Sequence, residues 1–182
     1  LIFDNADGLG AALVDRMELK GQSCQRVMAA TPEERRVAAK RFAASTEPAP
    51  QGVIYLAATD AGNNEQGEPD FEGARDAGWG GVLDVVHGVL ESGVARPPRL
   101  WLVTRGAQAA GDTPRPLALA QAPLWGLGRV IASEHPELAC TRIDLDPDGH
   151  AGEIDLLMDD VYLGGTEDQI AYRRGDRFVS RL

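Results

Sequence analysis

Glycines and carboxylates gather in residues 3–10, where the chain passes from an apolar start into a helical pattern. Gly8 and Gly10 have the spacing with which glycine-rich loops bring a dinucleotide pyrophosphate against a helix N-terminus. Asp4 and Asp7 would place two negative charges beside that dianion. A like-charge pair about 4 Å apart costs about 4 kcal/mol at an effective dielectric constant of 20. We therefore expect a vestigial loop, in which the glycines allow a tight turn and close packing and hold no cofactor.

A working dinucleotide loop differs from this one at defined positions. In short-chain dehydrogenases it reads Thr-Gly-x-x-x-Gly-x-Gly, whereas here Phe3 replaces the threonine and Asp4 replaces the first glycine. Such a site also needs an acid for the ribose, or an arginine for a 2′-phosphate, about 20 residues further on. The strand end at residues 27–30 reads Val-Met-Ala-Ala and offers neither group. We expect this chain to bind no dinucleotide.

The tyrosines do not provide reductase chemistry. Short-chain reductases donate a proton from a tyrosine supported by a lysine or asparagine four residues on, on the same helix face. The residues at that distance after Tyr55, Tyr162 and Tyr172 are Thr59, Thr166 and Asp176. None of these pairs fits, so we predict no catalytic residue and no enzyme activity for this chain alone.

Histidines, cysteines and acids are not spaced as metal ligands. His87, His135 and His150 share no ligand spacing with one another or with the cysteines. Residues 144–155 resemble a calcium-binding loop, but its last ligand is Asp155 instead of glutamate and the segment continues a strand-like pattern. A Pro-Asp-Gly turn explains these residues more simply. We predict no metal site.

Strand-like and helix-like patterns alternate along the chain and define the scaffold for these residues. Helical spacing and start signals predict helices at residues 8–21, 31–44, 74–92, 118–134 and 152–163. Apolar runs predict strands at residues 1–4, 24–29, 52–58, 99–104 and 139–145, and then two short strands at 169–173 and 177–182. Strands separated by helices imply a parallel sheet with helices on both faces. We predict one domain over residues 1–182, of α/β class, with an open, truncated Rossmann-like sheet.

The overall composition argues against several kinds of partner. A net charge of −10 would repel nucleic acid, and no apolar run reaches the roughly 20 residues that span a bilayer. The N-terminus has no basic segment of the secretory kind and begins like a strand already under way, which predicts a fragment of a longer chain. Arginines outnumber lysines sixteen to two, as is typical of GC-rich bacterial genomes. We expect a bacterial cytoplasmic protein, with both cysteines reduced.

Five segments together resemble modular type I polyketide synthases. Residues 121–138, QAPLWGLGRVIASEHPEL, are the most specific of them, and residues 98–107 and 143–147 flank this helix motif. In that family these sequences belong to the structural, non-catalytic subdomain of the ketoreductase. Residues 167–182 resemble the segment that closes the subdomain, and residues 1–10 resemble its first strand and degenerate loop. The resemblance covers nearly the whole chain.

The resemblance implies a function that depends on a second subdomain. The structural subdomain is a cofactor-free, truncated Rossmann fold, similar to short-chain dehydrogenases. It packs on a catalytic subdomain that binds NADPH and reduces the β-keto group of a carrier-bound substrate. Expected neighbours in the synthase also include an enoylreductase domain and an acyl carrier protein. Two alternatives stay open: a pseudo-ketoreductase remnant that serves as a spacer or docking element beside an enoylreductase, and an NADPH-dependent short-chain reductase with an unusual loop.

The C-terminal tail is the candidate contact with that partner. Its two short strands are predicted to surround a turn at Gly175 and Asp176, with no further strand in this chain to extend the sheet. Exposed edge strands are an aggregation hazard unless something covers them. The residues expected to contact the catalytic subdomain are Gln169, Ile170, Tyr172, Phe178 and Val179. The alternative is a hairpin that folds on the chain's own sheet.

Overall fold

The computed structural model describes residues 1–182 apart from residues 29–30, 48, 61–67, 112–115, 164 and 182. The strands are β1 (Ile2–Phe3), β2 (Arg26–Val27), β3 (Gly52–Tyr55), β4 (Arg99–Arg105), β5 (Thr141–Leu145), β6 (Gln169–Arg173) and β7 (Asp176–Val179). The α-helices are α1 (Leu9–Leu19), α2 (Pro32–Ala43), α3 (Phe71–Gly73), α4 (Gly80–Glu91), α5 (Pro123–Glu134) and α6 (Glu153–Leu163). A π-helical segment, η1 (Ala74–Trp79), joins α3 to α4, and a 3₁₀ turn, η2 (Pro136–Leu138), follows α5.

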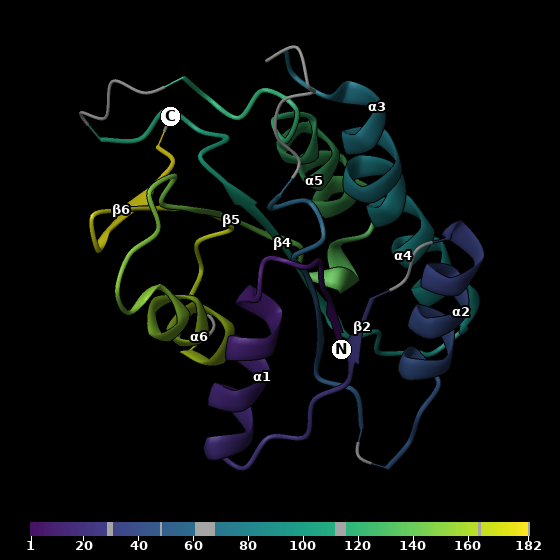
Figure 1. Ribbon diagram of the computed structural model, residues 1–182. Helices are drawn as coiled ribbons and strands as arrows, with labels where there is room; N and C mark the ends of the chain where they lie inside the picture. The colour runs from purple at the N-terminus through teal and green to yellow at the C-terminus, as the bar shows by residue number, and fades with distance from the viewer. Residues whose placement is uncertain (29–30, 48, 61–67, 112–115, 164, 182) are drawn as a thin grey trace.

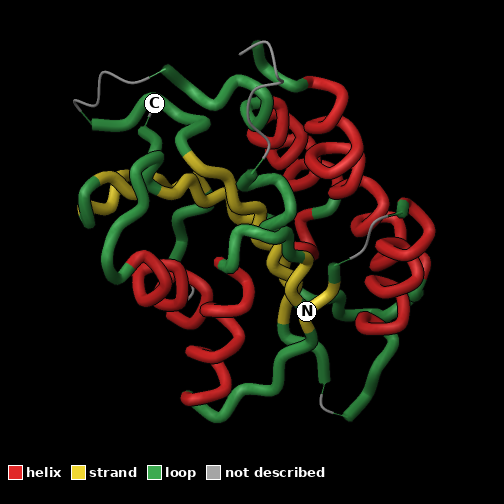
Figure 2. Tube along the Cα trace, viewed as in Figure 1, coloured by secondary structure: helices red, strands yellow, loops and turns green. Residues whose placement is uncertain are grey.

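The seven strands form one sheet in the order β2-β1-β3-β4-β5-β6-β7, in which only the β6–β7 pair is antiparallel. Helices α1 and α6 lie together on one face, and α2, α4 and α5 cover the other (Figure 1). In Figure 2 the yellow strands run between these two groups of red helices. The predicted α/β class and truncated Rossmann-like parallel sheet are therefore confirmed.

Alternation along the strands supplies both faces of the core. Ile2 and Ile54 pack with Leu13 of α1, whereas Phe3 and Tyr55 face the helices on the opposite side. Successive side chains of a strand point to opposite faces, so each short apolar run fills two hydrophobic layers. The observed strands β1, β2 and β3 are shorter than predicted, because continuous apolar runs mark burial without marking where strand pairing stops.

Local signals set the ends of α2 and α5. The Thr31 hydroxyl accepts the Glu34 N–H at 3.3 Å and the Glu34 carboxylate accepts the Thr31 N–H at 3.0 Å, a reciprocal capping box. Helix α5 begins at Pro123, and not at residue 118 as predicted, because proline is favoured in the first helical turn and residues 118–122 form turns.

The helical segment before β4 begins earlier than predicted. We expected its start at residue 74, but Asp70 caps α3 by accepting the Gly73 N–H at 2.9 Å. Gly78, within η1, departs from helical backbone angles with φ −88° and ψ −110°. Tyr55 donates its hydroxyl hydrogen to the Ala77 carbonyl and so holds this irregular turn against β3.

The C-terminal hairpin folds on the chain's own sheet. Strand β6 extends the parallel sheet beside β5 and pairs with β7, as in the alternative of a hairpin that folds on the chain's own sheet. The two-residue turn lies at Arg174 and Gly175, both with positive φ, one position earlier than predicted. Tyr172 donates to the Leu156 carbonyl at 3.1 Å, and Arg177 pairs with Asp160 at 2.8 Å, so the hairpin is tied to α6.

Candidate dinucleotide site

The candidate site lies at the carboxyl ends of β1 and β3. These strands are neighbours in the sheet, but the chain leaves β1 through α1 on one face and reaches β3 through α2 on the other. Open α/β sheets bind ligands at such a switch point, with phosphate groups at the N-terminus of the following helix. Residues 4–8 and the turn after β3 line this position.

The Asp4 carboxylate lies between the first turn of α1 and Arg26 of β2. It is fully buried, and its Oδ1 accepts the Gly10 N–H of the first turn of α1 at 3.2 Å. Its Oδ2 pairs with Nε of Arg26 at 2.5 Å. A Cβ at position 10 would overlap this carboxylate, so Gly10 makes room for Asp4. The predicted vestigial residues Asp4, Gly8 and Gly10 do lie together, but the loop has an internal anion in it.

The polar side chains of Asn5, Asp7 and Thr59 at the candidate site bond to one another. Asn5 donates its amide to Oγ1 of Thr59 at 3.0 Å, and Thr59 in turn donates to Asp7 at 2.8 Å. Asp7 also accepts the Leu9 N–H at 2.9 Å, so a second carboxylate caps the start of α1. Gly8 has φ +88°, a left-handed conformation that favours glycine. The tight-turn role predicted for Gly8 matches this geometry.

Arg26 is the residue that sequence reasoning missed. We looked for an arginine or an acid in residues 27–30, one position too late. No local signal in the sequence marks it, because the register of the sheet decides the contact: Arg26 lies opposite Ile2 in the parallel ladder, and Ile2 is two residues before Asp4. Its Nε donates to Oδ2 of Asp4 at 2.5 Å, and the Arg26 side chain is partly exposed whereas that of Asp4 is fully buried.

The two tyrosines with buried rings lack the environment of a proton donor. Tyr55 donates to a backbone carbonyl of η1 and Tyr172 to one of α6. Burial raises the pKa of both hydroxyls, and Asp160 raises that of Tyr172 further. A reductase lowers the pKa of its tyrosine instead. Tyr162 lies on α6 and is largely exposed.

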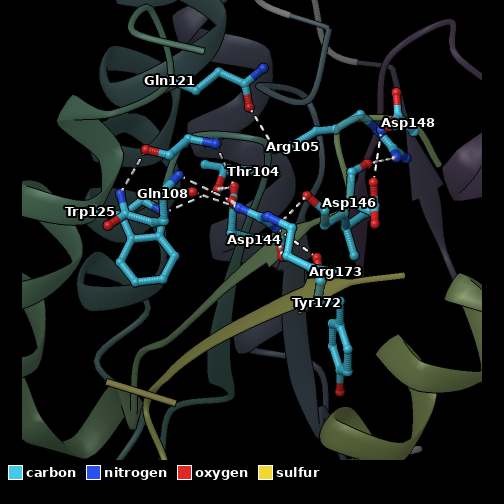
Figure 3. A network of polar contacts seen from close by, with 12 residues as sticks. Thr104, Arg105, Gln108, Gln121, Trp125, Asp144, Asp146, Asp148, Tyr172 and Arg173 are labelled. Atoms are coloured by element: carbon cyan, nitrogen blue, oxygen red, sulfur yellow. Dashed lines mark hydrogen bonds and ion pairs between the residues drawn. The ribbon is translucent and has the colours of Figure 1, made fainter. Parts of the chain in front are cut away.

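A charged network occupies the carboxyl ends of β4, β5 and β6 (Figure 3). Asp144 is fully buried and accepts from the Thr104 hydroxyl at 2.5 Å and from the N–H groups of Ala107 and Gln108 at 2.8 and 3.1 Å. Arg173 pairs with the same carboxylate at 2.5 Å and donates to the Gln108 carbonyl at 2.7 Å. The network joins three strands and the loop after β4.

Residues of the specific helix motif belong to this network. The Trp125 indole N–H donates to Oγ1 of Thr104 at 3.0 Å. Gln121 accepts the Arg105 N–H at 2.8 Å and donates to the Thr59 carbonyl at 3.2 Å, which links the network to the candidate site. Thr104, Gln121 and Trp125 therefore bond to other groups of this chain.

Asp146 and Arg105 continue the network toward α6. Arg105 forms a two-pronged pair with Glu153, with N–O distances of 3.0 and 2.9 Å. Burial alone would raise the pKa of Asp146. Hydrogen bonds from the backbone N–H groups of Arg174 and Asp148 nevertheless hold that pKa below its usual value. Among the described residues, no group of three or more histidines, cysteines or acids could hold a metal ion, and no helix is long and apolar enough to cross a membrane.

Comparison with known proteins identifies the family. The sequence profile described as "Polyketide synthase extender module SpnB, Rossmann fold domain" matches residues 11–182. The chain belongs to this family. It is 39% identical over 132 residues to pikromycin polyketide synthase component PikAII of Streptomyces venezuelae, covering 72% of this chain and 3% of that protein. It is 43% identical over 101 residues to a phenolphthiocerol/phthiocerol polyketide synthase of Mycobacterium tuberculosis, covering 56% of this chain and 4% of that protein.

Solved structures place the chain within a ketoreductase. A C2-type ketoreductase from a modular polyketide synthase superposes with a TM-score of 0.73 at 28% identity, covering 98% of this chain and 38% of that one. A-type ketoreductases superpose equally well at 26% identity, with 36% of their chain covered. A short-chain dehydrogenase/reductase from Brucella ovis shares the fold alone, with a TM-score of 0.63 at 16% identity. The chain is thus a Rossmann-fold structural subdomain of a polyketide synthase ketoreductase and spans about a third of the ketoreductases it matches.

Proposed function

We propose that this chain is the non-catalytic scaffold of its ketoreductase: it packs on and stabilises an NADPH-binding catalytic subdomain that reduces carrier-bound β-ketoacyl groups. The observation that carries this proposal is Asp4, which stands where a dinucleotide loop has glycine and whose buried carboxylate accepts the Gly10 N–H of α1 and pairs with Arg26. The chain covers 38% of a solved ketoreductase. With a buried carboxylate in its own loop, its proposed role is to support the rest of such an enzyme. The cofactor then belongs to the other subdomain.

The isolated chain is expected not to bind NADPH up to millimolar concentration. The pyrophosphate would have to displace the buried Asp4 carboxylate and break its pair with Arg26. Calorimetric titration of the purified chain measures this directly, and an active ketoreductase from the same synthase provides the positive control. Saturable binding in the low micromolar range would contradict the scaffold role and favour a reductase.

The contact with the catalytic subdomain is proposed at the β7 edge and the groove beside it. The five predicted interface residues divide in the structure: Ile170 and Tyr172 are buried in this chain's own core, 2% and 3% exposed, although Ile170 also lines the groove between α5 and the hairpin. Gln169, Phe178 and Val179 remain accessible and line a groove of about 280 Å³ between α5 and the hairpin. Within the described part of the chain, strand β7 is the last strand of the sheet and pairs with β6. An unpaired edge beside a partly apolar groove suits a protein partner.

A Phe178→Asp variant is expected to weaken association with a separately expressed catalytic subdomain at least tenfold, because it buries a charge against the partner. Affinity is measured by calorimetry and by the recovery of reductase activity when the two polypeptides are mixed. Leu19→Asp is the matched control: Leu19 ends α1 at 80% exposure, and α1 contacts β2, which lies at the opposite edge of the sheet from β7. Equal affinities for the two variants would move the interface away from β7, whereas absence of binding by the wild-type chain would overturn the scaffold role itself.

A further inference from the structure

The cofactor implied by the fold does not fit the residues of this chain, and the misfit has a specific form. In place of the first glycine of a dinucleotide loop the chain has Asp4, and a Cβ at Gly10 would already collide with its carboxylate. There is no room for a phosphate group unless Asp4 leaves. The carboxylate excludes the ligand both by volume and by like charge.

The bonds of Asp4 are those that a bound phosphate would make. One carboxylate oxygen accepts a backbone N–H from the first turn of α1, and the other pairs with an arginine from β2. Helix N-termini carry partial positive charge and favour an anion such as a pyrophosphate, and an arginine near the end of the second strand is the group that accommodates the 2′-phosphate of NADP. Both contributions converge on a side chain with no solvent exposure.

We infer that Asp4 is a built-in substitute for the cofactor phosphate: with Arg26 it completes the anion position at the start of α1. The backbone at Asp4 stays in the sheet, since its N–H bonds to the Val27 carbonyl at 3.0 Å. Only the side chain turns toward the helix. The subdomain therefore folds in its final form without a nucleotide, and the anion position would be regained by an external phosphate if the carboxylate were removed. This inference deepens the account of the lost cofactor site but does not depend on what the chain docks against.

The test compares thermal unfolding of wild-type and Asp4→Gly chains with and without inorganic pyrophosphate at constant ionic strength. The variant is expected to unfold at lower temperature and to regain roughly 5 °C in saturating pyrophosphate. The wild-type midpoint is expected to stay unchanged. Adding Arg26→Gln to Asp4→Gly is expected to abolish the recovery, while Asp15→Asn, which removes an exposed acid on the same helix, is expected to behave as wild type.

Two results would overturn the inference. One is an equal pyrophosphate response in the wild-type chain, which would mean that Asp4 does not occupy the anion position. The other is a folded Asp4→Gly chain that does not respond. If Asp4→Gly does not fold, a double-mutant cycle of Asp4→Asn and Arg26→Gln replaces it. The sum of the two single-variant shifts in unfolding midpoint is expected to be larger than the shift of the double variant. Additive shifts would refute the pairing of Asp4 with Arg26. The NADPH titration of the wild-type chain tests the proposed function, and these unfolding experiments test the role of Asp4, so the two results can be told apart.

Discussion

Replacement of Arg173 by methionine is expected to destabilise the chain by about 3–5 kcal/mol, because it leaves the buried Asp144 carboxylate without its counter-charge. Arg173 is 4% exposed and also donates to the Leu145 carbonyl at 3.1 Å and the Gln108 carbonyl at 2.7 Å. Methionine keeps much of the side-chain volume but none of these bonds. The free energy of unfolding from urea titration measures the loss.

The matched control for Arg173 is Arg16→Met. Arg16 pairs with Asp155 on the surface, where both side chains are about half exposed, so its loss is expected to cost about 1 kcal/mol or less, the value of an exposed pair. Adding Asp144→Leu to Arg173→Met is not expected to restore stability, since Thr104 and the Ala107 and Gln108 N–H groups would lose their acceptor. A loss below about 1 kcal/mol for Arg173→Met would contradict the importance of this network.

A Gly88→Ala substitution is expected to destabilise the chain by about 1–3 kcal/mol through overpacking. Gly88 lies on α4 against α2: a Cβ there would overlap the backbone carbonyl oxygen of Arg36 and lie 3.0 Å from Cβ of Ala39. The obstacle is helix backbone, which can yield only if the two helices separate. Thermal and urea unfolding of the two proteins measure the difference.

The control for Gly88 is the same exchange on another helix. Gly126 of α5 is exposed, and a Cβ there would meet no atom within 4 Å. Gly126→Ala is therefore expected to stabilise the chain by about 0.5–1 kcal/mol through helix propensity. If both substitutions changed stability in the same direction, the close approach of α2 and α4 would not explain the glycine at position 88.

The fold class was predictable because its signals are local. Apolar runs alternate along the chain with segments of helical spacing. Thr31 and Glu34, three positions apart, indicate the start of α2. The absence of a standard nucleotide loop was also predictable, since Asp4 stands where the family of reductases has glycine. What that aspartate does was not. Its partners Gly10 and Arg26 lie six and 22 positions away, and only the pairing of β1 with β2 brings the arginine to it.

The C-terminal tail shows the same division between local and tertiary information. Two short strands and a glycine turn were evident from residues 169–182, but the sequence did not indicate that they would pair beside β5 at the edge of the sheet. The sequence of a strand does not indicate which neighbouring strand it pairs with. Ile170 and Tyr172 were therefore predicted to contact the catalytic subdomain, although they are buried in this chain's own core. The sequence by itself determined most of the elements and the departure of residues 3–10 from a standard dinucleotide loop. Only the tertiary structure decided that Asp4 fills that loop and that Arg173 neutralises Asp144, because charges far apart in the chain become partners only when the sheet aligns the strands that carry them.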